Sequence, residues 1–308
     1  MSDTPLLFDR RLLRERRARF AAEIEEREAL IGHVAGEIAD RVALMLRDFP
    51  RALDLGAYHG LLGRTIAELP SVGEVVYAES VLAYARRCPP PAVVCDEDAL
   101  PFKDGAFNLI VSGLALHRVN DLPGSLIQIR RALAPDGLFM AAALGGSALG
   151  ELRECLLEAE DEIEGGVSPR ISPFADVRSY GALLQRAGFA MPVTDTEDLE
   201  VIYPSPRALM HEIRALGGGN VLMARSKKPM SRQVLARAED LYRARYGTPD
   251  GKITATFQFV FMSGWAPDPS QQQPLKPGSA RNRLADALNT TEQTGGAKAS
   301  FRNEDPPK

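Results

Sequence analysis

The chain has 308 residues, of which 45% are hydrophobic and 25% are charged, and its formal net charge is −4. This composition predicts a globular protein with a sizeable core. The slightly acidic balance argues against nucleic acid as a partner, because backbone phosphates attract clustered positive charge. Three cysteines without C-x-x-C spacing indicate neither a disulfide framework nor a zinc site, which favours a reducing compartment.

The opening residues 1–17, MSDTPLLFDRRLLRERR, lack the apolar core of a secretory signal, and their acidic residues argue against a mitochondrial presequence. No apolar run approaches the roughly 18 residues that would cross a bilayer. We therefore expect a cytoplasmic bacterial protein. Six arginines lie among residues 10–19, with leucines between them. They could bind an acidic partner or a membrane surface, or they could belong to a docked amphipathic helix.

A helical period runs over residues 8–48, where apolar side chains recur at intervals of three and four, and Phe49-Pro50 ends it. We assign residues 1–49 to an N-terminal helical segment. Five short apolar runs follow, each separated by helical or turn-rich sequence. They span residues 51–55, 74–78, 92–95, 108–112 and 138–144. Strands that alternate with helices predict a mostly parallel sheet with both faces covered.

The second half continues with helices and two late strands. A helix over 123–134 stops at the turn Pro135-Asp136-Gly137, and further helices are predicted over 151–164 and 179–189. Residues 205–246 are predicted to be largely helical, with an interruption at Gly217-Gly218-Gly219, and strands are predicted over 193–203 and 253–265. We therefore predict an α/β fold: a doubly wound, Rossmann-like sheet of about seven strands over residues 50–265, with a helical insertion at 205–246. Residues 266–308 are rich in polar residues and proline, which predicts a disordered tail.

Ligands of doubly wound sheets bind at the carboxyl ends of the strands. After the first strand comes DLGAYHG, in which Asp54, Gly56 and Gly60 suit a tight turn against a polar ligand. Glu79 follows the second strand, where an acid could accept two ribose hydroxyls or could be a solvated loop residue. Asp96 follows the third strand and could accept from an exocyclic amine or belong to a charged turn.

The fourth strand ends in SGLALHRVND, which places His117 near the mouth of the site. It could act as a base, because its ordinary pKa lies near physiological pH, or it could be a structural residue. No histidine in the chain is followed at the second position by an acid, so the sequence gives no sign of an iron site and we expect no metal. The acidic helix 151–164 could attract an arginine-bearing substrate or form a solvated face.

These segments together resemble the class I S-adenosylmethionine-dependent methyltransferases. The resemblance rests on LDLG and the later glycine of that turn, on Glu79, on DEDALPF, on NLIVSGLALHRVNDLPGSLIQIRRALAPDGLF and on the closing strand pair. Within that superfamily, LFDRRLLRERRARFA, GGSALGELRECLLEAEDEIEGGVSPRISPF, LLQRAGF and ATFQFVFMSGW resemble the family of the mitochondrial respiratory complex I assembly factor five and its bacterial relatives, over nearly the whole length.

The resemblance implies S-adenosylmethionine as the cofactor, with Gly56 and Gly60 at its methionine end, Glu79 at the ribose, and Asp96 with Glu97 at the adenine. Tyr58 departs from the pattern, since it stands where a middle glycine is usual. Its ring must either turn clear of the methionine pocket or fill it. Asn108 is a second departure, since it stands where the superfamily usually has Asp.

The mitochondrial relative is implicated in hydroxylating an arginine of a complex I subunit, despite its methyltransferase fold. We therefore expect a methyltransferase acting on a protein during complex I assembly; the alternatives are arginine hydroxylation of a complex I subunit and a non-catalytic assembly chaperone. The expected partner is an arginine-bearing complex I subunit, through which the protein could contact the inner membrane peripherally. The sequence leaves the oligomeric state open.

Overall fold

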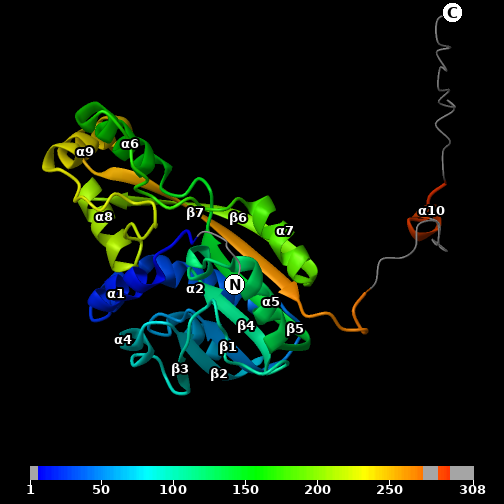
Figure 1. The fold of residues 1–308 in the computed structure, drawn as a ribbon. Helices are drawn as coiled ribbons and strands as arrows, with labels where there is room; N and C mark the ends of the chain where they lie inside the picture. The colour runs from blue at the N-terminus through cyan, green and yellow to red at the C-terminus, as the bar shows by residue number, and fades with distance from the viewer. Residues whose placement is uncertain (1–5, 273–283, 292–308) are drawn as a thin grey trace, which may run out of the picture. The chain divides into compact units, whose positions relative to one another are not determined.

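A computed structural model describes residues 6–272 and 284–291 of the chain. Its sheet has seven strands in the order β3-β2-β1-β4-β5-β7-β6 (Figure 1). The strands are β1 (Phe49–Leu55), β2 (Val72–Glu79), β3 (Ala92–Val94), β4 (Phe107–Gly113), β5 (Leu133–Leu144), β6 (Ala190–Tyr203) and β7 (Ile253–Trp265). Strands β1 to β5 pair in parallel, and β7 pairs antiparallel with both β5 and β6. The predicted α/β fold class is therefore confirmed.

Helices cover both faces of the sheet and divide the core into two layers. One layer buries the apolar sides of α2 (Ala29–Ala43) and α3 (Leu61–Ala67), and the other buries those of α5 (Leu122–Ala132) and α7 (Val177–Ala187). The remaining helical elements are α1 (Arg10–Phe20), η1 (Ile24–Arg27), α4 (Leu82–Ala85), η2 (Leu116–Arg118), α6 (Gly150–Glu164), α8 (Pro206–Ala215), α9 (Arg232–Tyr246) and α10 (Leu284–Ala287).

The single helix predicted over residues 8–48 is wrong, because the structure breaks it between α1 and α2 at η1. The apolar face of α2 packs on the sheet, with Val34 and Ile38 fully buried. The arginines of α1 instead reach acids at the carboxyl ends of β2 and β3. The break at η1 lets α1 lie beside α4 and α8, near the carboxyl ends of β2 and β3 (Figure 1).

One other boundary differs from the prediction, and a predicted interruption is confirmed. Residues 135–137 do not separate helix from strand, because β5 begins at Leu133 and runs through them as an irregularity, with Asp136 at φ +56° and a shift in register against β4. The predicted interruption of 205–246 at Gly217-Gly218-Gly219 is confirmed, because residues 216–231 separate α8 from α9 and Gly217 adopts φ +77°.

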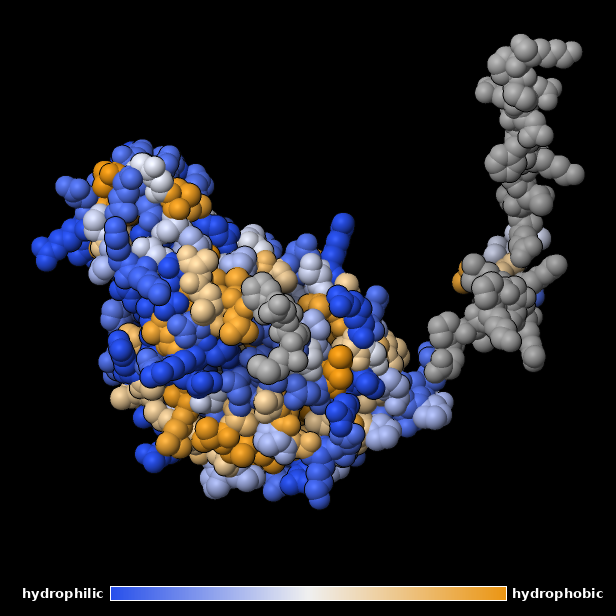
Figure 2. Space-filling model, in the orientation of Figure 1, coloured by the Kyte–Doolittle hydropathy of each residue, from blue (hydrophilic) through white to orange (hydrophobic). Residues whose placement is uncertain are grey.

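Residues up to Pro269 form one compact unit, and the residues from Ser270 belong to a second. The predicted tail, 266–308, falls largely on residues 273–283 and 292–308, which lie outside the described part; the short helix α10 lies between them. Among the described residues, no helix is both long and apolar enough to cross a membrane. Figure 2 shows mainly hydrophilic side chains over α6 and α9, where Glu154 and Glu158 pair with Arg245.

Candidate functional site

The turn after β1 has the backbone that only glycine tolerates well. Gly56 adopts φ +73°, and a Cβ there would lie 2.2 Å from the Cβ of Ala115, in the loop after β4. Gly60 adopts φ +85° at the start of α3, where a Cβ would lie 3.0 Å from the ring of Tyr77. Since L side chains rarely adopt these angles, both predicted glycines are required by the local fold. They hold the carboxyl end of β1 tightly against the loop after β4.

Asp54, also predicted as a site residue, points into the protein beneath this turn. Its Oδ2 accepts from the backbone N–H of Gly63 at 2.8 Å, and its Oδ1 has no partner among the described residues. The side chain is fully buried, and burial raises the pKa of Asp54 to about 7. Asp54 therefore supports the turn by accepting a hydrogen bond from the first turn of α3.

The other predicted acids gather where β2 and β3 end, and we call Glu79, Asp96 and Glu97 the strand-end carboxylates. Glu79 and Glu97 are buried, and the Oγ of Ser80 lies within hydrogen-bonding distance of both. They converge at the carboxyl ends of neighbouring strands, and their roles at ribose and adenine stay predictions. Three negative charges at one place also need counter-charges, which the protein supplies from α1.

We call Arg10, Arg14 and Arg17 the α1 arginines. Arg17 Nη2 lies 3.0 Å from Glu79 Oε2, Arg14 Nη1 lies 2.6 Å from Asp96 Oδ2, and Arg10 pairs with both Asp96 and Glu97. Burial works to lower the pKa of Arg17, but Glu79 raises it above the ordinary value, so the guanidinium stays charged. The N-terminal arginines thus form a docked helix, one of the alternatives that the sequence left open.

The oxygens of Glu79 have all their contacts inside the protein. Oε2 accepts from Arg17 and from the backbone N–H of Tyr58 at 2.8 Å, and Oε1 accepts from the N–H of Val81 at 2.8 Å and faces Ser80. The predicted role of Glu79 at a ribose stays a prediction. A pair of ribose hydroxyls could bind Glu79 only if Arg17 released it.

Tyr58, the unexpected residue of the turn, has a buried ring and adopts φ +52°. Its hydroxyl donates to the carbonyl oxygen of Leu114 at 3.2 Å, and the guanidinium carbon of Arg17 lies 4.2 Å from the ring centroid. The ring is therefore wedged between α1 and the loop after β4. On its other side it lines a cavity.

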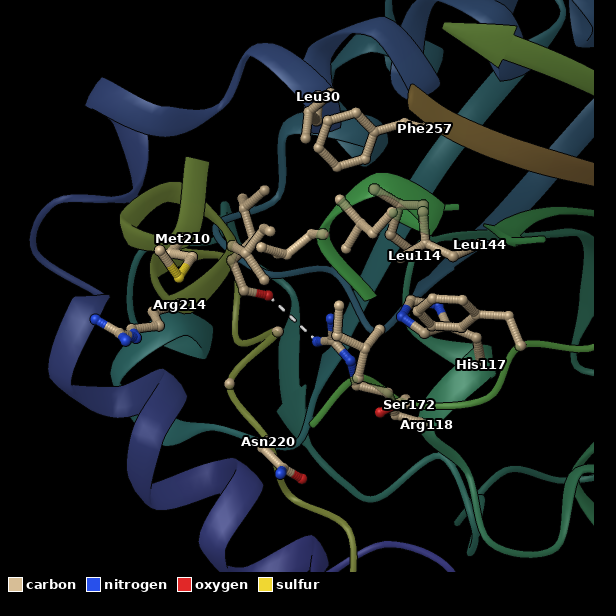
Figure 3. A pocket seen from close by; sticks show the side chains of 18 of the residues that line it. Leu30, Leu114, His117, Arg118, Leu144, Ser172, Met210, Arg214, Asn220 and Phe257 are labelled. Carbon is tan, nitrogen blue, oxygen red and sulfur yellow. Dashed lines mark hydrogen bonds between the residues drawn. The ribbon is translucent and has the colours of Figure 1, made fainter. Parts of the chain in front are cut away.

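The cavity has a volume of about 170 Å³ and lies between α2, α6, α8 and β7. Apolar side chains such as Leu30, Leu144 and Phe257 form most of its wall (Figure 3). Polar groups line it mainly on one side, where His117 and Arg118 project from η2. The cavity thus combines an apolar body with a polar end, as small-molecule sites commonly do.

His117, which was predicted near the mouth of the site, lines the cavity. It is buried, neither ring nitrogen has a hydrogen-bond partner among the described residues, and the ring lies edge-on to Phe174. Burial lowers the pKa of His117 well below its ordinary value, with help from the nearby charges of Arg118 and Arg17. A neutral imidazole there can donate one hydrogen bond and accept another, but it holds a proton weakly. His59 of the turn does not line the cavity; its Nε2 lies 2.8 Å from Glu28.

The acidic helix α6 uses several of its acids within the chain. Glu154 and Glu158 pair with Arg245, Glu162 pairs with Arg237, and Glu160 pairs with Arg170. The arginines that it attracts are therefore, at these positions, those of its own protein. Groups of three or more His, Cys, Asp or Glu arranged to hold a metal are absent from the described part of the chain.

Sequence reasoning missed Arg118 and the pairing of the α1 arginines with the strand-end carboxylates. Arg118 directly follows the predicted His117, so the sequence placed it near the site. The sequence does not show that both side chains are buried. The spacing of Arg10, Arg14 and Arg17 at intervals of four and three residues was the available signal for α1, because it places the three side chains on one helix face.

The sheet order and the strand-end site define a methyltransferase fold. Residues 53–141 match the family described as a methyltransferase domain. Among solved structures, the YcgJ protein from Bacillus subtilis has a TM-score of 0.52 at 17% identity and covers 77% of this chain and 99% of its own. This similarity supports the fold.

Curated relatives identify the family. The arginine-hydroxylase NDUFAF5 of Danio rerio is 37% identical over 288 residues, which cover 91% of this chain and 89% of the relative. The malonyl-acyl-carrier-protein O-methyltransferase of Halorhodospira halophila is 34% identical over 281 residues, which cover 89% and 93%. The chain belongs to the methyltransferase-domain family that includes the NDUFAF5 arginine-hydroxylases, and the predicted resemblance is confirmed.

Proposed function

We propose that this protein is an enzyme that binds S-adenosylmethionine at the strand-end site and transfers a methyl group to a protein during respiratory complex I assembly. The observation that carries the proposal is the convergence of the Gly56 turn and the strand-end carboxylates at one sheet edge, beside a partly apolar cavity. The cofactor would supply an already activated methyl group. The protein's own residues would then need only to align the acceptor and exclude water.

Each part of the site has a role in this proposal. Gly56 and Gly60 would let the backbone approach the methionine end, Glu79 would accept the ribose hydroxyls, and Asp96 with Glu97 would accept from the adenine amine. Binding would require the α1 arginines to yield the carboxylates. Neutral His117 would orient the acceptor or take its proton, although the lowered pKa of His117 makes it a weak base.

Arginine hydroxylation is the second candidate, and the names of the NDUFAF5 relatives favour it. The other relative's name describes an O-methyltransferase, so the family carries at least two named reactions. In either case the proposed partner is an arginine-bearing complex I subunit, met in the cytoplasm at the inner membrane. A non-catalytic assembly role would need neither cofactor nor turnover.

Calorimetric titration with S-adenosylmethionine tests the cofactor site. Because Glu97→Gln alone would also remove one of the acid partners of Arg10, the informative variant is Glu97→Gln with Arg10→Gln, compared with Arg10→Gln alone. We expect the added loss of Glu97 to weaken binding by about tenfold, as removal of a charged acceptor does. The pair Asp104→Asn with Arg131→Gln, an exposed ion pair elsewhere, is the matched control. No binding at millimolar cofactor would refute the proposal.

Mass spectrometry of complex I subunits from wild-type and deletion strains tests the reaction. A methyl group that is lost from a subunit on deletion supports methyl transfer, whereas a lost hydroxyl on arginine supports hydroxylation. If neither modification changes while complex I assembly fails, the non-catalytic role is favoured instead.

A further inference from the structure

Arg118 is a buried guanidinium that no described acid neutralises. The residue is 8% exposed, its Nη1 donates to the carbonyl oxygen of Leu216 at 3.2 Å, and the Tyr58 hydroxyl is a further neighbour. It makes no ion pair with any Asp or Glu in the described ranges, and Arg17 and Arg10 add repulsion. This differs from Arg17, which is equally buried and has Glu79.

An uncompensated buried charge is expensive, because desolvation is not offset by an opposite charge. A guanidinium does not escape this cost by losing its proton. The fold nevertheless places Arg118 here, and Gly217 and Gly218 let the backbone pass close to it: a Cβ on Gly217 would lie 3.2 Å from Arg118 Nη1. The positive charge faces the cavity rather than a protein acid.

Figure 3 shows the direction of the polar groups. The Arg118 guanidinium points toward the interior of the cavity, whereas Arg214, which also lines it, points away. The third arginine of the wall, Arg170, is paired with Glu160. Arg118 is therefore the lining arginine whose charge is directed inward and has no acid.

His117 completes the polar end. Neither of its ring nitrogens has a partner within the described part of the chain although the residue is only 7% exposed, and it is adjacent to Arg118 in η2. A neutral imidazole can donate its one N–H to an anion that sits on the guanidinium. Two neighbouring donors, one of them charged, suit the two oxygens of a carboxylate.

The rest of the wall sets the size and character of the ligand. Apart from Arg214, the lining side chains from α2, α6, α8 and β7 are apolar, including Leu30, Leu152, Met210 and Phe257. A dry apolar cavity of about 150 Å³ holds a benzene molecule, so about 170 Å³ accommodates roughly six to eight non-hydrogen atoms. The ligand must be small and mainly apolar, with a negative head.

We propose that this cavity binds a small carboxylic acid with an aliphatic or aromatic body, its carboxylate on Arg118 and His117. The cavity is unsuited to an arginine side chain, because a second guanidinium beside Arg118 would be repelled without an acid to shield it. The inference does not depend on methyl transfer, and it goes beyond the proposed function. If a subunit arginine is modified, that arginine approaches the site by another route.

The test titrates the full chain, without cofactor, with hexanoate and with two probes that share its body, hexanamide and hexylguanidinium. We expect hexanoate to bind at least about tenfold more tightly than hexanamide, and hexylguanidinium to bind most weakly. Arg118→Met should reduce the hexanoate preference to about one. Arg214→Met, which alters a lining arginine that points away, should leave the preference within about twofold of wild type.

Two further measurements separate ligand binding from a structural role. Hexanoate should raise the melting temperature of the wild-type protein and of Arg214→Met but not of Arg118→Met. Arg118→Lys keeps the charge and should retain part of the preference, which provides a second variant if Arg118→Met does not fold. Equal binding of hexanoate and hexanamide, tighter binding of hexylguanidinium, or an unchanged preference in Arg118→Met would each overturn the proposal.

Discussion

The strand-end carboxylates are paired with charges of opposite sign, whereas the buried Arg118 of the neighbouring cavity has no acid partner among the described residues. At the strand ends, three acids are matched by the three α1 arginines, and Glu79 has every oxygen in contact. In the cavity, Arg118 and His117 lie buried with no acid partner among residues 6–272 and 284–291, and within those ranges the His117 ring makes no hydrogen bond. Tyr58 separates the two regions and contacts both.

A ligand would therefore bind the two regions in different ways. The strand-end site is satisfied by its own chain, so a ligand must compete with α1. Arg118 of the cavity has no acid partner among the described residues, so an anionic ligand would offset the desolvation free energy of its buried charge. A cofactor and a carboxylate would therefore respond differently to the same kinds of substitution.

The largest effect is expected from Glu79→Leu. It leaves Arg17 buried without a counter-charge and removes the acceptor of the Tyr58 and Val81 N–H groups. Breaking a buried pair from one side costs about 3–5 kcal/mol, and urea unfolding would measure it. Glu74→Leu, on the same strand in an exposed pair with Arg51, is the control and should change the free energy of unfolding by about 0.5 kcal/mol or less. Similar decreases in the free energy of unfolding for both variants would contradict the stabilising pairing of Glu79 with Arg17.

A second prediction concerns Asp54, the buried acid of this region that lacks an arginine partner within 6–272. Its folded-state pKa of about 7 lies above the ordinary 3.8, so the stability it contributes is present below about pH 4 and is lost as pH rises toward 7. Between about pH 5 and 7, the free energy of unfolding should fall by up to about 1.4 kcal/mol per unit. Asp54→Asn should remove this component, and exposed Asp104→Asn should not. Equal slopes in all three proteins would show that Asp54 titrates normally.

Arg118→Met provides the contrast to Glu79→Leu. Because it removes a buried charge without stranding an opposite one, we expect the free energy of unfolding to rise by about 1–2 kcal/mol despite the lost bond to Leu216. Arg17→Met should lower it, since Glu79 would then be stranded. Chemical denaturation of both variants measures the difference. A lower free energy of unfolding in both variants would contradict the interpretation that the charge of Arg118 is uncompensated.

The sequence predicted the parallel core well, because apolar runs between turn residues fit buried strands and little else. All five early runs lie in β1 to β5 apart from Cys95, which follows β3, and the Gly56 turn lies where the fold needs it. Glu79, Asp96 and Glu97 converge because parallel strands end at one edge. These parts follow from local pattern and from topology alone.

The charge balance could not be predicted, because it depends on contacts between distant segments. Arg10 and Asp96 are 86 positions apart, and an arginine-rich helix has the same sequence whether it is docked or solvated. Tyr58 had two open outcomes, and the structure wedges its ring between Arg17 and the cavity. The burial of Arg118 without an acid partner among the described residues cannot be predicted from the residues next to it in the sequence.

The smallest expected effect sharpens the comparison most directly, because it tests whether α1 competes with the cofactor. Arg14 is partly exposed and pairs with Asp96, so Arg14→Gln loosens α1 without stranding a fully buried charge. Ion pairs of this kind contribute about 0.2–1 kcal/mol, so affinity for S-adenosylmethionine should rise by about 1.4- to fivefold in calorimetry. Arg11→Gln is the matched control, since Arg11 is exposed on the same helix and pairs with Glu15.

Salt supplies an independent check on this competition, because added ions screen a partly exposed pair. The gap in affinity between Arg14→Gln and the wild type should therefore narrow as ionic strength rises. A fall in affinity for Arg14→Gln would reverse the interpretation, since the arginine would then hold the ligand rather than exclude it. The strand-end site would in that case resemble the cavity, with its cations serving an anionic part of the ligand.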